Sequence, residues 1–185
     1  MPSRKKRGVR GPAASVSASA VRPKTSLGPS LPPRIGWREW VRLPDFEIPT
    51  IKAKVDTGAR TSSLHAFDME EVTRRGRAFL RFAVHPEQRS ARGSVRVEAP
   101  LVERRRVRSS SGHTDLRPVV RTKVELLGMC WEVELTLTSR DEMGFRMLLG
   151  RQALRGRFLV DPGASFLNGR RKKGTRRLLT KPKRS

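Results

Sequence analysis

Disulfide bonds and membrane spans are the first features that this sequence excludes, because cysteines and long apolar runs are nearly absent. Its 185 residues include one cysteine, Cys130, which cannot cross-link the chain and favours a reducing, cytoplasmic compartment. No apolar run approaches the roughly 20 residues of a membrane-spanning helix. In a secretory signal an apolar stretch follows the first basic residues, and this sequence has no such stretch there. We therefore predict a cytoplasmic protein without membrane contact.

Aromatic residues and metal ligands are also few. The chain has three Trp, seven Phe and no Tyr, so no array of stacking rings typical of an RNA-binding surface is visible. The imidazole and thiol groups are scattered singly, without an H-E-x-x-H motif, at His65, His85, His113 and Cys130. The sequence therefore predicts no metal site.

Acidic residues are rare, and the charge is unevenly spread. The chain has 41 Lys and Arg against 17 Asp and Glu, a net charge of +24. Residues 1–34 hold eight cations, residues 168–185 hold nine, and neither segment has an acid, whereas residues 35–167 carry a net +7. The first segment is also rich in Ser, Ala, Pro and Gly. We predict disordered basic tails at 1–34 and 168–185 around one folded domain at 35–167.

The motif Asp56-Thr57-Gly58 ends a run with strand periodicity. Residues 51–55 alternate apolar and basic side chains, which predicts a half-buried strand with its lysines facing water. A carboxylate at the end of such a strand is held on a rigid element, Thr57 offers a hydroxyl beside it, and Gly58 allows close approach of the main chain. These residue types suit an aspartate that activates water. The alternative is an aspartate that only caps a turn.

Most of the remaining domain has the pattern of short strands. Strands are predicted at 35–41, 62–67, 79–84, 94–100, 101–108 and 157–160, with a long hairpin of 118–127 and 129–138 around Gly128. In its second strand the side chains expected to face water are Glu132, Glu134, Thr136 and Thr138. Residues 68–77 are predicted as a helical turn or a loop, and residues 152–155 as a short helix. Turns about every eight to twelve residues indicate an all-β fold, a small closed barrel with one short helix.

Four segments together carry a family resemblance. The run M-L-L-G-R at 147–151 follows the D-T-G motif by some ninety residues, and 156–162 reads G-R-F-L-V-D-P. With I-G-W-R-E-W at 35–40 and K-A-K-V-D-T-G-A-R-T-S-S-L-H-A at 52–66, they resemble the bacterial family labelled "ATP-dependent zinc protease". Its members are RimB-like proteins with a retropepsin-like aspartic peptidase domain, often encoded beside RimK-type glutamate ligases. The resemblance covers about residues 35–167 and implies a retropepsin-like barrel in which the Leu-Leu-Gly strand packs beside the D-T-G loop.

The resemblance also implies an aspartic endopeptidase with Asp56, Thr57 and Gly58 as catalytic residues. Such an enzyme needs two adjacent carboxylates that share one proton, because two like charges so close cannot both ionise. One carboxylate deprotonates a water, and the other protonates the scissile carbonyl or the leaving amine. The chain has one D-T-G, and D-P-G at 161–163 is interpreted as a turn, so we predict a homodimer with Asp56 from each subunit. The alternatives within one chain are Asp115, Asp141 and Asp161.

Arginines around the motif predict an acidic substrate. Arg60 follows the catalytic turn, and Arg146 and Arg151 flank the Leu-Leu-Gly strand, so a cleft there would have a cationic rim. The alternative is that these arginines only solvate the surface. The family's association with glutamate ligases implies oligoglutamate-like protein segments, for example on a ribosomal protein. The predicted substrate-binding residues are Ala59, Arg60, Arg146, Leu149, Gly150 and Arg151.

A flap and cofactors complete the predicted site. Residues 105–119, with Gly112 and His113 near the tip, form a candidate flap that closes over the substrate, or else an ordinary surface turn. The zinc and ATP of the family label are not predicted as cofactors. The run G-R-R-K-K-G-T at 169–175 has the spacing of a phosphate loop but lacks the Gly-Lys-Ser/Thr ending and a preceding strand.

The competing function is a non-catalytic RNA- or ribosome-binding protein on a retropepsin-like barrel. In that case the tail cations would contact phosphates. The two functions are compatible, because basic tails can bring a peptidase to ribosomes. The D-T-G motif favours the enzyme, since a pure binding protein has no use for Asp56.

Overall fold

Eleven strands and two short helices account for most of the residues that the computed structural model describes, which are 31–87, 93–108, 112–139, 144–167 and 169. The first half contains β1 (Arg34–Gly36), β2 (Arg38–Leu43), the 3-10 helix η1 (Pro44–Phe46), β3 (Ile48–Asp56), β4 (Ser62–His65), β5 (Phe67–Arg74) and β6 (Arg77–Val84). The second half contains β7 (Val95–Arg108), β8 (Thr114–Leu126), β9 (Met129–Thr138), β10 (Met147–Gly150), α1 (Arg151–Leu154) and β11 (Leu159–Asp161).

The chain divides into two units, residues 1–31 and 32–185. Of the first unit, only Leu31 is described. The predicted basic tails lie outside the described residues, apart from 31–34 and Gly169. Their disorder therefore remains a prediction.

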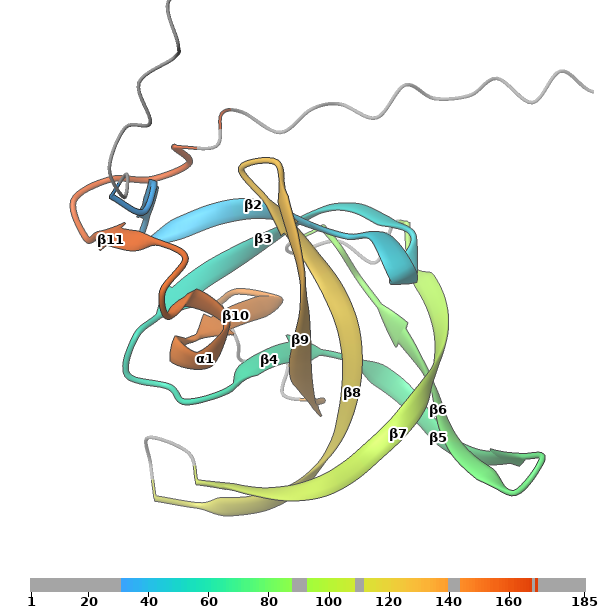
Figure 1. The fold of residues 1–185 in the computed structure, drawn as a ribbon. Coiled ribbons are helices and arrows are strands. Elements are labelled where there is room, and N and C mark those ends of the chain that lie inside the picture. The colour runs from blue at the N-terminus through green and yellow to red at the C-terminus, as the bar shows by residue number, and fades with distance from the viewer. Residues whose placement is uncertain (1–30, 88–92, 109–111, 140–143, 168, 170–185) are drawn as a thin grey trace, which may run out of the picture. The chain divides into compact units, whose positions relative to one another are not determined.

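Nine strands form one sheet in the order β2-β3-β10-β4-β9-β8-β7-β6-β5. Arg42 of β2 also pairs with Glu125 of β8, which joins two distant strands of that order and closes the sheet into a barrel (Figure 1). The strands β7, β6 and β5 continue beyond the closure, and β1 pairs separately with β11. The predicted all-β fold, a small closed barrel with one short α-helix, is confirmed, and the 3-10 helix η1 adds a single turn. Within the described residues, no helix has the length and apolar character needed to cross a bilayer.

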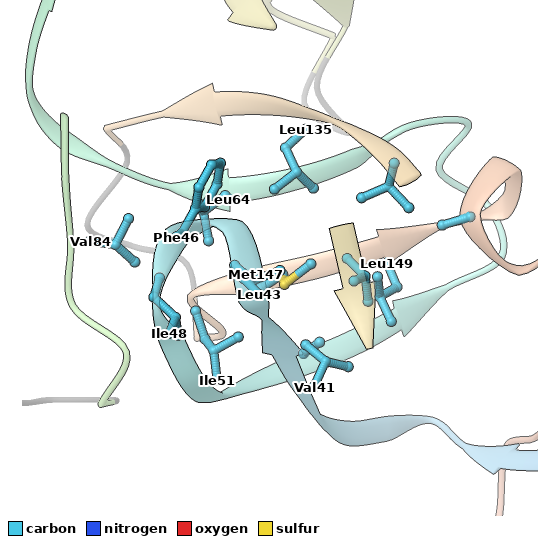
Figure 2. Packing of buried hydrophobic residues seen from close by; sticks show 14 of the residues in the cluster. Val41, Leu43, Phe46, Ile48, Ile51, Leu64, Val84, Leu135, Met147 and Leu149 are labelled. Atoms are coloured by element: carbon cyan, nitrogen blue, oxygen red, sulfur yellow. The ribbon is translucent and has the colours of Figure 1, made fainter. Parts of the chain in front are cut away.

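The hydrophobic core lies inside this barrel and consists of the inward-facing residues of its strands. The alternation predicted for 51–55 is confirmed, because Ile51, Ala53 and Val55 are at most 7% exposed. Figure 2 shows apolar side chains from β2, β3, β4, β9 and β10 meeting in one cluster. The strand that ends at Asp56 is therefore fixed along its whole inner face by burial, which stabilises each large apolar side chain by about 1.5–3 kcal/mol.

A tight junction of main chain connects both ends of the domain to the strand that bears Asp56. A Cβ on Gly36 would lie 2.4 Å from the carbonyl oxygen of Ala164, so glycine is required there. The fully buried Glu39 accepts hydrogen bonds through Oε1 from the N–H groups of Gly36 (2.7 Å) and Leu167 (2.9 Å). This contact explains an acid at an inward position of the I-G-W-R-E-W run, because buried carboxylates need such donors.

Three details of the predicted elements were wrong. Residues 68–77 belong to the β5–β6 hairpin, where β5 has no buried face that would give a strand period, and Glu70 forms an ion pair with Arg81 across the two strands (3.9 Å). The two strands predicted at 94–100 and 101–108 are one continuous strand, β7 (Val95–Arg108). Thr136 and Thr138 are buried, and the Thr136 hydroxyl donates to the carbonyl of Ser62 at 3.1 Å, so the exposed face of β9 ends at Glu134.

Candidate active site

Asp56 is the last residue of β3, at the start of the loop that leads to β4. Its Oδ1 accepts hydrogen bonds from the N–H groups of Gly58 (3.1 Å) and Ala59 (3.0 Å). Its Oδ2 has no hydrogen-bond partner among the described residues. The carboxylate therefore caps the turn with one oxygen and leaves the other for chemistry, so the two interpretations of the motif are compatible.

The Leu-Leu-Gly strand lies directly beside this loop. In the parallel pairing of β10 with β3, Gly150 is in register with Asp56. A Cβ on Gly150 would lie 2.4 Å from the carbonyl carbon and oxygen of Thr61, so the loop crosses the strand at the closest possible distance. The Gly150 N–H donates to Ser62 Oγ at 3.1 Å. The packing implied by the family resemblance is therefore present.

The short helix α1 holds the other side of the loop. Its first N–H groups, on Arg151 and Gln152, donate to the carbonyls of Ala59 (2.8 Å) and Arg60 (3.1 Å). The Arg151 side chain also donates from Nη1 to the carbonyl of Thr57 at 3.3 Å. The first N–H groups of a helix have no partner within the helix, and here two of them pair with loop carbonyls. These hydrogen bonds hold the loop in one conformation although it is exposed.

A cavity of about 310 Å³ separates the outgoing limb of this loop from the base of the β7–β8 hairpin. It is lined by Arg60, Thr61, Glu103, Arg105, Glu134 and Gln152. A second cavity of about 300 Å³ shares Glu134 and Gln152 with it and extends to Ala153. The long strands β7 and β8 sweep toward the side of the barrel where the β3–β4 loop lies (Figure 1). The hairpin chosen as the candidate flap therefore forms one wall of a hollow beside the D-T-G loop.

Charges in this wall are mostly paired. Arg105 bridges Glu103 and Glu134, and Arg121 also reaches Glu134 at 3.4 Å. The hydrogen bond from Arg105 is the main cause that lowers the pKa of Glu134 below its ordinary value, and the same bond raises the pKa of Arg105. Arg60 makes no ion pair with any described residue, and the lining as a whole holds two arginines and two glutamates.

Not every predicted site residue lies beside Asp56. Arg146 precedes β10, four residues and about 13 Å of strand from Gly150. Leu149 is fully buried in the core and supports the site without exposing its side chain. Gly112 and His113 are exposed at the described end of the β7–β8 hairpin, whose residues 109–111 lie outside the described part.

The alternative carboxylates within the chain are engaged elsewhere. Asp115 pairs with Arg117 (2.9 Å) on the hairpin, and Asp161 pairs with Arg34 (2.6 Å) on β11. Asp161 Oδ1 also accepts from the Gly163 N–H at 2.9 Å, as the turn interpretation of D-P-G requires. Asp141 lies outside the described residues.

The donor residues of the described chain do not fit a zinc site. No three His, Cys, Asp or Glu side chains in that part gather closely enough to hold a metal ion. His85 stacks on Phe67 with ring centroids 4.0 Å apart, His113 contacts Asp115 at 2.9 Å, and Cys130 is exposed on β9. A structural or catalytic zinc needs three or four such ligands together.

Sequence reasoning missed the wall of the cavity. Arg105 was predicted only as part of the flap, Glu134 as facing water, Glu103 as part of a strand and Gln152 as part of a short helix. The alternation on β9 marked its polar face, whereas the charged run 103–106 on β7 marked none. Nothing local showed that this face turns toward the D-T-G loop, because strand curvature decides it.

Comparisons with known proteins agree with this geometry. The family model described as RimB-like, a retropepsin-like aspartic endopeptidase, matches residues 34–171. A crystal structure of a Legionella pneumophila protein of unknown function is 31% identical, with a TM-score of 0.60, and the match covers 73% of this chain and 97% of that one.

Curated relatives are named for a ligase. A probable alpha-L-glutamate ligase of Shewanella pealeana is 47% identical over 135 residues, which is 73% of this chain and 30% of that protein. One of Parasynechococcus marenigrum is 48% identical, over 73% of this chain and 29% of its own length. The chain thus spans less than a third of the curated relatives that it matches. With the family model covering the D-T-G loop, the Leu-Leu-Gly strand and the barrel around them, the chain belongs to the RimB-like family of retropepsin-like aspartic endopeptidases.

Proposed function

We propose that this chain is an aspartic endopeptidase whose active site forms between two copies of it. The observation that carries the proposal is the presentation of Asp56 on a rigid, exposed loop with Oδ2 unengaged by any described residue. Peptide hydrolysis by this chemistry needs a second carboxylate, and the candidates within the described chain, Asp115 and Asp161, are held in other ion pairs. A second Asp56, brought by a two-fold axis, supplies the group.

The mechanism assigns different tasks to the same residue in two subunits. The paired carboxylates share one proton, since ionising both at short distance is unfavourable. The ionised Asp56 takes a proton from the attacking water, and the protonated one donates to the carbonyl oxygen or the leaving nitrogen. The N–H groups of Gly58 and Ala59 hold Oδ1 in place, so the carboxylate does not need to reorient during the reaction.

The hydroxyl of Thr57 is placed where it could make a contact in the proposed dimer. Its residue is exposed, and its hydroxyl has no partner among the described residues, while its carbonyl is held by Arg151. We assign the hydroxyl to bracing the same turn of the partner subunit. Such a contact orders the two loops against each other and thereby sets the distance between the two carboxylates.

The preferred substrate is an acidic peptide segment of the oligoglutamate type. Arg60 and Arg151 are both exposed and lie on or against the D-T-G loop, and neither has a carboxylate partner in the described part of the chain. An acidic side chain beside the scissile bond would meet this charge. The name of the relatives, alpha-L-glutamate ligase, supports a glutamate-rich substrate. These relatives are more than three times as long as the segment that matches.

Replacement of one carboxylate tests the shared site. Asp56→Asn keeps the hydrogen bonds to Oδ1 and removes the ionisable group, so the variant should fold, dimerise and be inactive on a fluorogenic glutamate-rich peptide. The matched control is Asp161→Asn, which removes an acid from a turn outside the loop and should stay active. Inactivity of this control, or activity of Asp56→Asn, contradicts the assignment.

Mixing subunits separates a shared site from two complete ones. With equal amounts of wild-type and Asp56→Asn subunits exchanging freely, about one quarter of the dimers carry two carboxylates. Activity should then approach one quarter of that of the same total amount of wild type. A value near one half means that each chain has a complete site. Activity should also fall as about the square of the protein concentration below the dimer dissociation constant.

A further inference from the structure

Four aromatic rings and three cations gather on the outer side of β2 and β3, in a group that we call the outer aromatic face. Its members are Trp37, Arg38, Trp40, Lys52, Lys54, Phe145 and Phe166. On β2 the residues that alternate with them, Glu39 and Val41, are buried. Since neighbouring residues of a strand point to opposite sides, the face lies on the outside of the barrel.

The rings of this face stack on one another. Trp40 stacks on Phe166 with centroids 5.5 Å apart and an angle of 21° between the rings, and Trp37 meets Phe145 edge-on at 5.8 Å. Each of these residues is only partly buried, so part of each remains in contact with solvent.

Cations lie over the same rings. The Arg38 guanidinium is 4.5 Å from the ring centre of Trp37 and 5.0 Å from that of Phe166. The Lys52 ammonium is 5.2 Å from Phe145 and 5.6 Å from Phe166. Lys54, in register with Arg38 on the neighbouring strand, is exposed and has no ion pair with a described residue. Aromatic surface and positive charge are therefore combined on one face.

The basic end segments join the chain next to this face. Arg34, the last of the eight cations of residues 1–34, precedes Trp37 by three positions. Phe166 precedes Arg170, the first of the nine cations of residues 168–185, by four positions. In the sequence, two strongly cationic segments without an acid are thus separated by only a few residues from members of the outer aromatic face.

We propose that the outer aromatic face is a docking surface for single-stranded RNA. Exposed ring surface can stack on unpaired bases, and the cations of the face, Arg38, Lys52 and Lys54, can contact phosphates. An acidic peptide would satisfy the charge but would have no use for the rings. The array was not visible in the sequence, because its rings come from three separate places, residues 37–40, 145 and 166. This proposal does not depend on Asp56 or on peptidase activity.

Tryptophan fluorescence of the full-length chain tests the docking surface. The chain has three tryptophans, and Trp131→Phe leaves only the two of the outer aromatic face. In this background a 12-nucleotide single-stranded RNA should quench the emission to saturation, because bases stack against Trp37 or Trp40. Heparin, a polyanion without bases, should bind the basic segments with little quenching. Equal quenching by RNA and heparin, or no quenching by RNA, overturns the proposal.

Substitutions then locate the surface. Phe166→Leu keeps an apolar side chain but removes a ring, and it should weaken RNA binding by about fivefold or more. Lys54→Glu should weaken binding and reduce the salt dependence, since a phosphate contact is lost. The control is Arg77→Glu, the same reversal of an exposed cation on β6, with a much smaller effect expected. Equal losses for Lys54→Glu and Arg77→Glu overturn the proposal.

Two further outcomes separate this surface from the peptidase site. If polyglutamate quenches the two tryptophans as strongly as RNA does, the face binds acidic peptides and the RNA proposal is wrong. Asp56→Asn should bind RNA as tightly as the wild type does. RNA binding that persists in an inactive Asp56→Asn protein supports the docking surface, and RNA binding that disappears with Asp56 contradicts its independence.

Discussion

Gly150→Ala should damage catalysis far more than it damages folding. The added Cβ would lie 2.4 Å from the carbonyl carbon and oxygen of Thr61, whereas real Cβ contacts are not found below 3.0 Å. These are main-chain atoms, so the main chain itself must move by about 0.6 Å or more. Thr61 belongs to the loop that starts at Asp56, and the loop is held by α1 on its other side. The displacement is therefore transmitted to the D-T-G turn.

The expected size of each effect follows from this geometry. Overpacking of a close contact costs about 1–3 kcal/mol of the free energy of unfolding. Displacement of a catalytic group by about 1 Å can cost roughly 100-fold in rate. We therefore expect kcat/KM on a glutamate-rich peptide to fall by about 100-fold, while the melting temperature falls by about 2–10 °C.

A matched control makes this prediction decisive. Leu80→Ala empties a buried site on β6 and should cost about 2–5 kcal/mol of stability. It leaves the loop untouched, so kcat per folded dimer should be unchanged below its melting temperature. The reasoning is refuted if Gly150→Ala retains wild-type kcat/KM. It is also refuted if Leu80→Ala loses activity to the same extent, because activity would then follow stability alone.

Three other changes test the charges and hydroxyls of the site. Ala59→Ser adds a hydroxyl where many pepsin-like sites have one, and a hydrogen bond from it favours the ionised form of the paired carboxylates. The basic limb of the pH–rate profile should therefore move to lower pH. A basic limb at the same or a higher pH contradicts this. Arg60→Glu should raise KM for acidic peptides by roughly threefold to tenfold with little change in kcat, whereas Arg77→Glu should not; equal KM values would exclude Arg60 from recognition. Because Arg105 lowers the pKa of Glu134, that pair stabilises the fold above the ordinary glutamate pKa and is lost as pH falls through the lowered value. Glu134→Gln should therefore lower the melting temperature at pH 7 and lose less stability than wild type on acidification, and parallel pH curves would contradict the pair.

The sequence predicted those strands whose apolar side chains recur with a period of two, including the strand that leads to the D-T-G motif. Residues 51–56 were identified as a strand ending at the carboxylate because one face of that strand is buried. The β8–β9 hairpin was identified because two long alternating runs flank Gly128. The β5 strand was missed because it lies at the sheet edge with polar residues on both faces, so burial leaves no period to read.

Contacts between distant segments were beyond the reach of local patterns. Glu39 is fully buried on the same side of β2 as Val41, and no pattern in the sequence predicted a buried acid there. Its partners include the N–H of Leu167, which is 128 residues away. The cavity wall formed by Arg105 and Glu134 likewise depends on how far β7 and β9 curve. The sequence can identify a residue type on a strand face, but barrel closure decides what that face meets.

In the proposed dimer each chain carries half of the site, and the contacts of the D-T-G loop within one chain are what would keep that half in place. Oδ1 of Asp56 is held by its own turn, and the loop carbonyls of Ala59 and Arg60 are held by α1. Gly150 packs directly against the main chain of Thr61 in the part of the loop that leads to β4. These contacts all come from the same chain, so the conformational entropy of ordering the loop is lost when the monomer folds and not when the dimer forms. In the proposed dimer, two preorganised loops would therefore bring two carboxylates within reach of one proton without a further cost of ordering either loop.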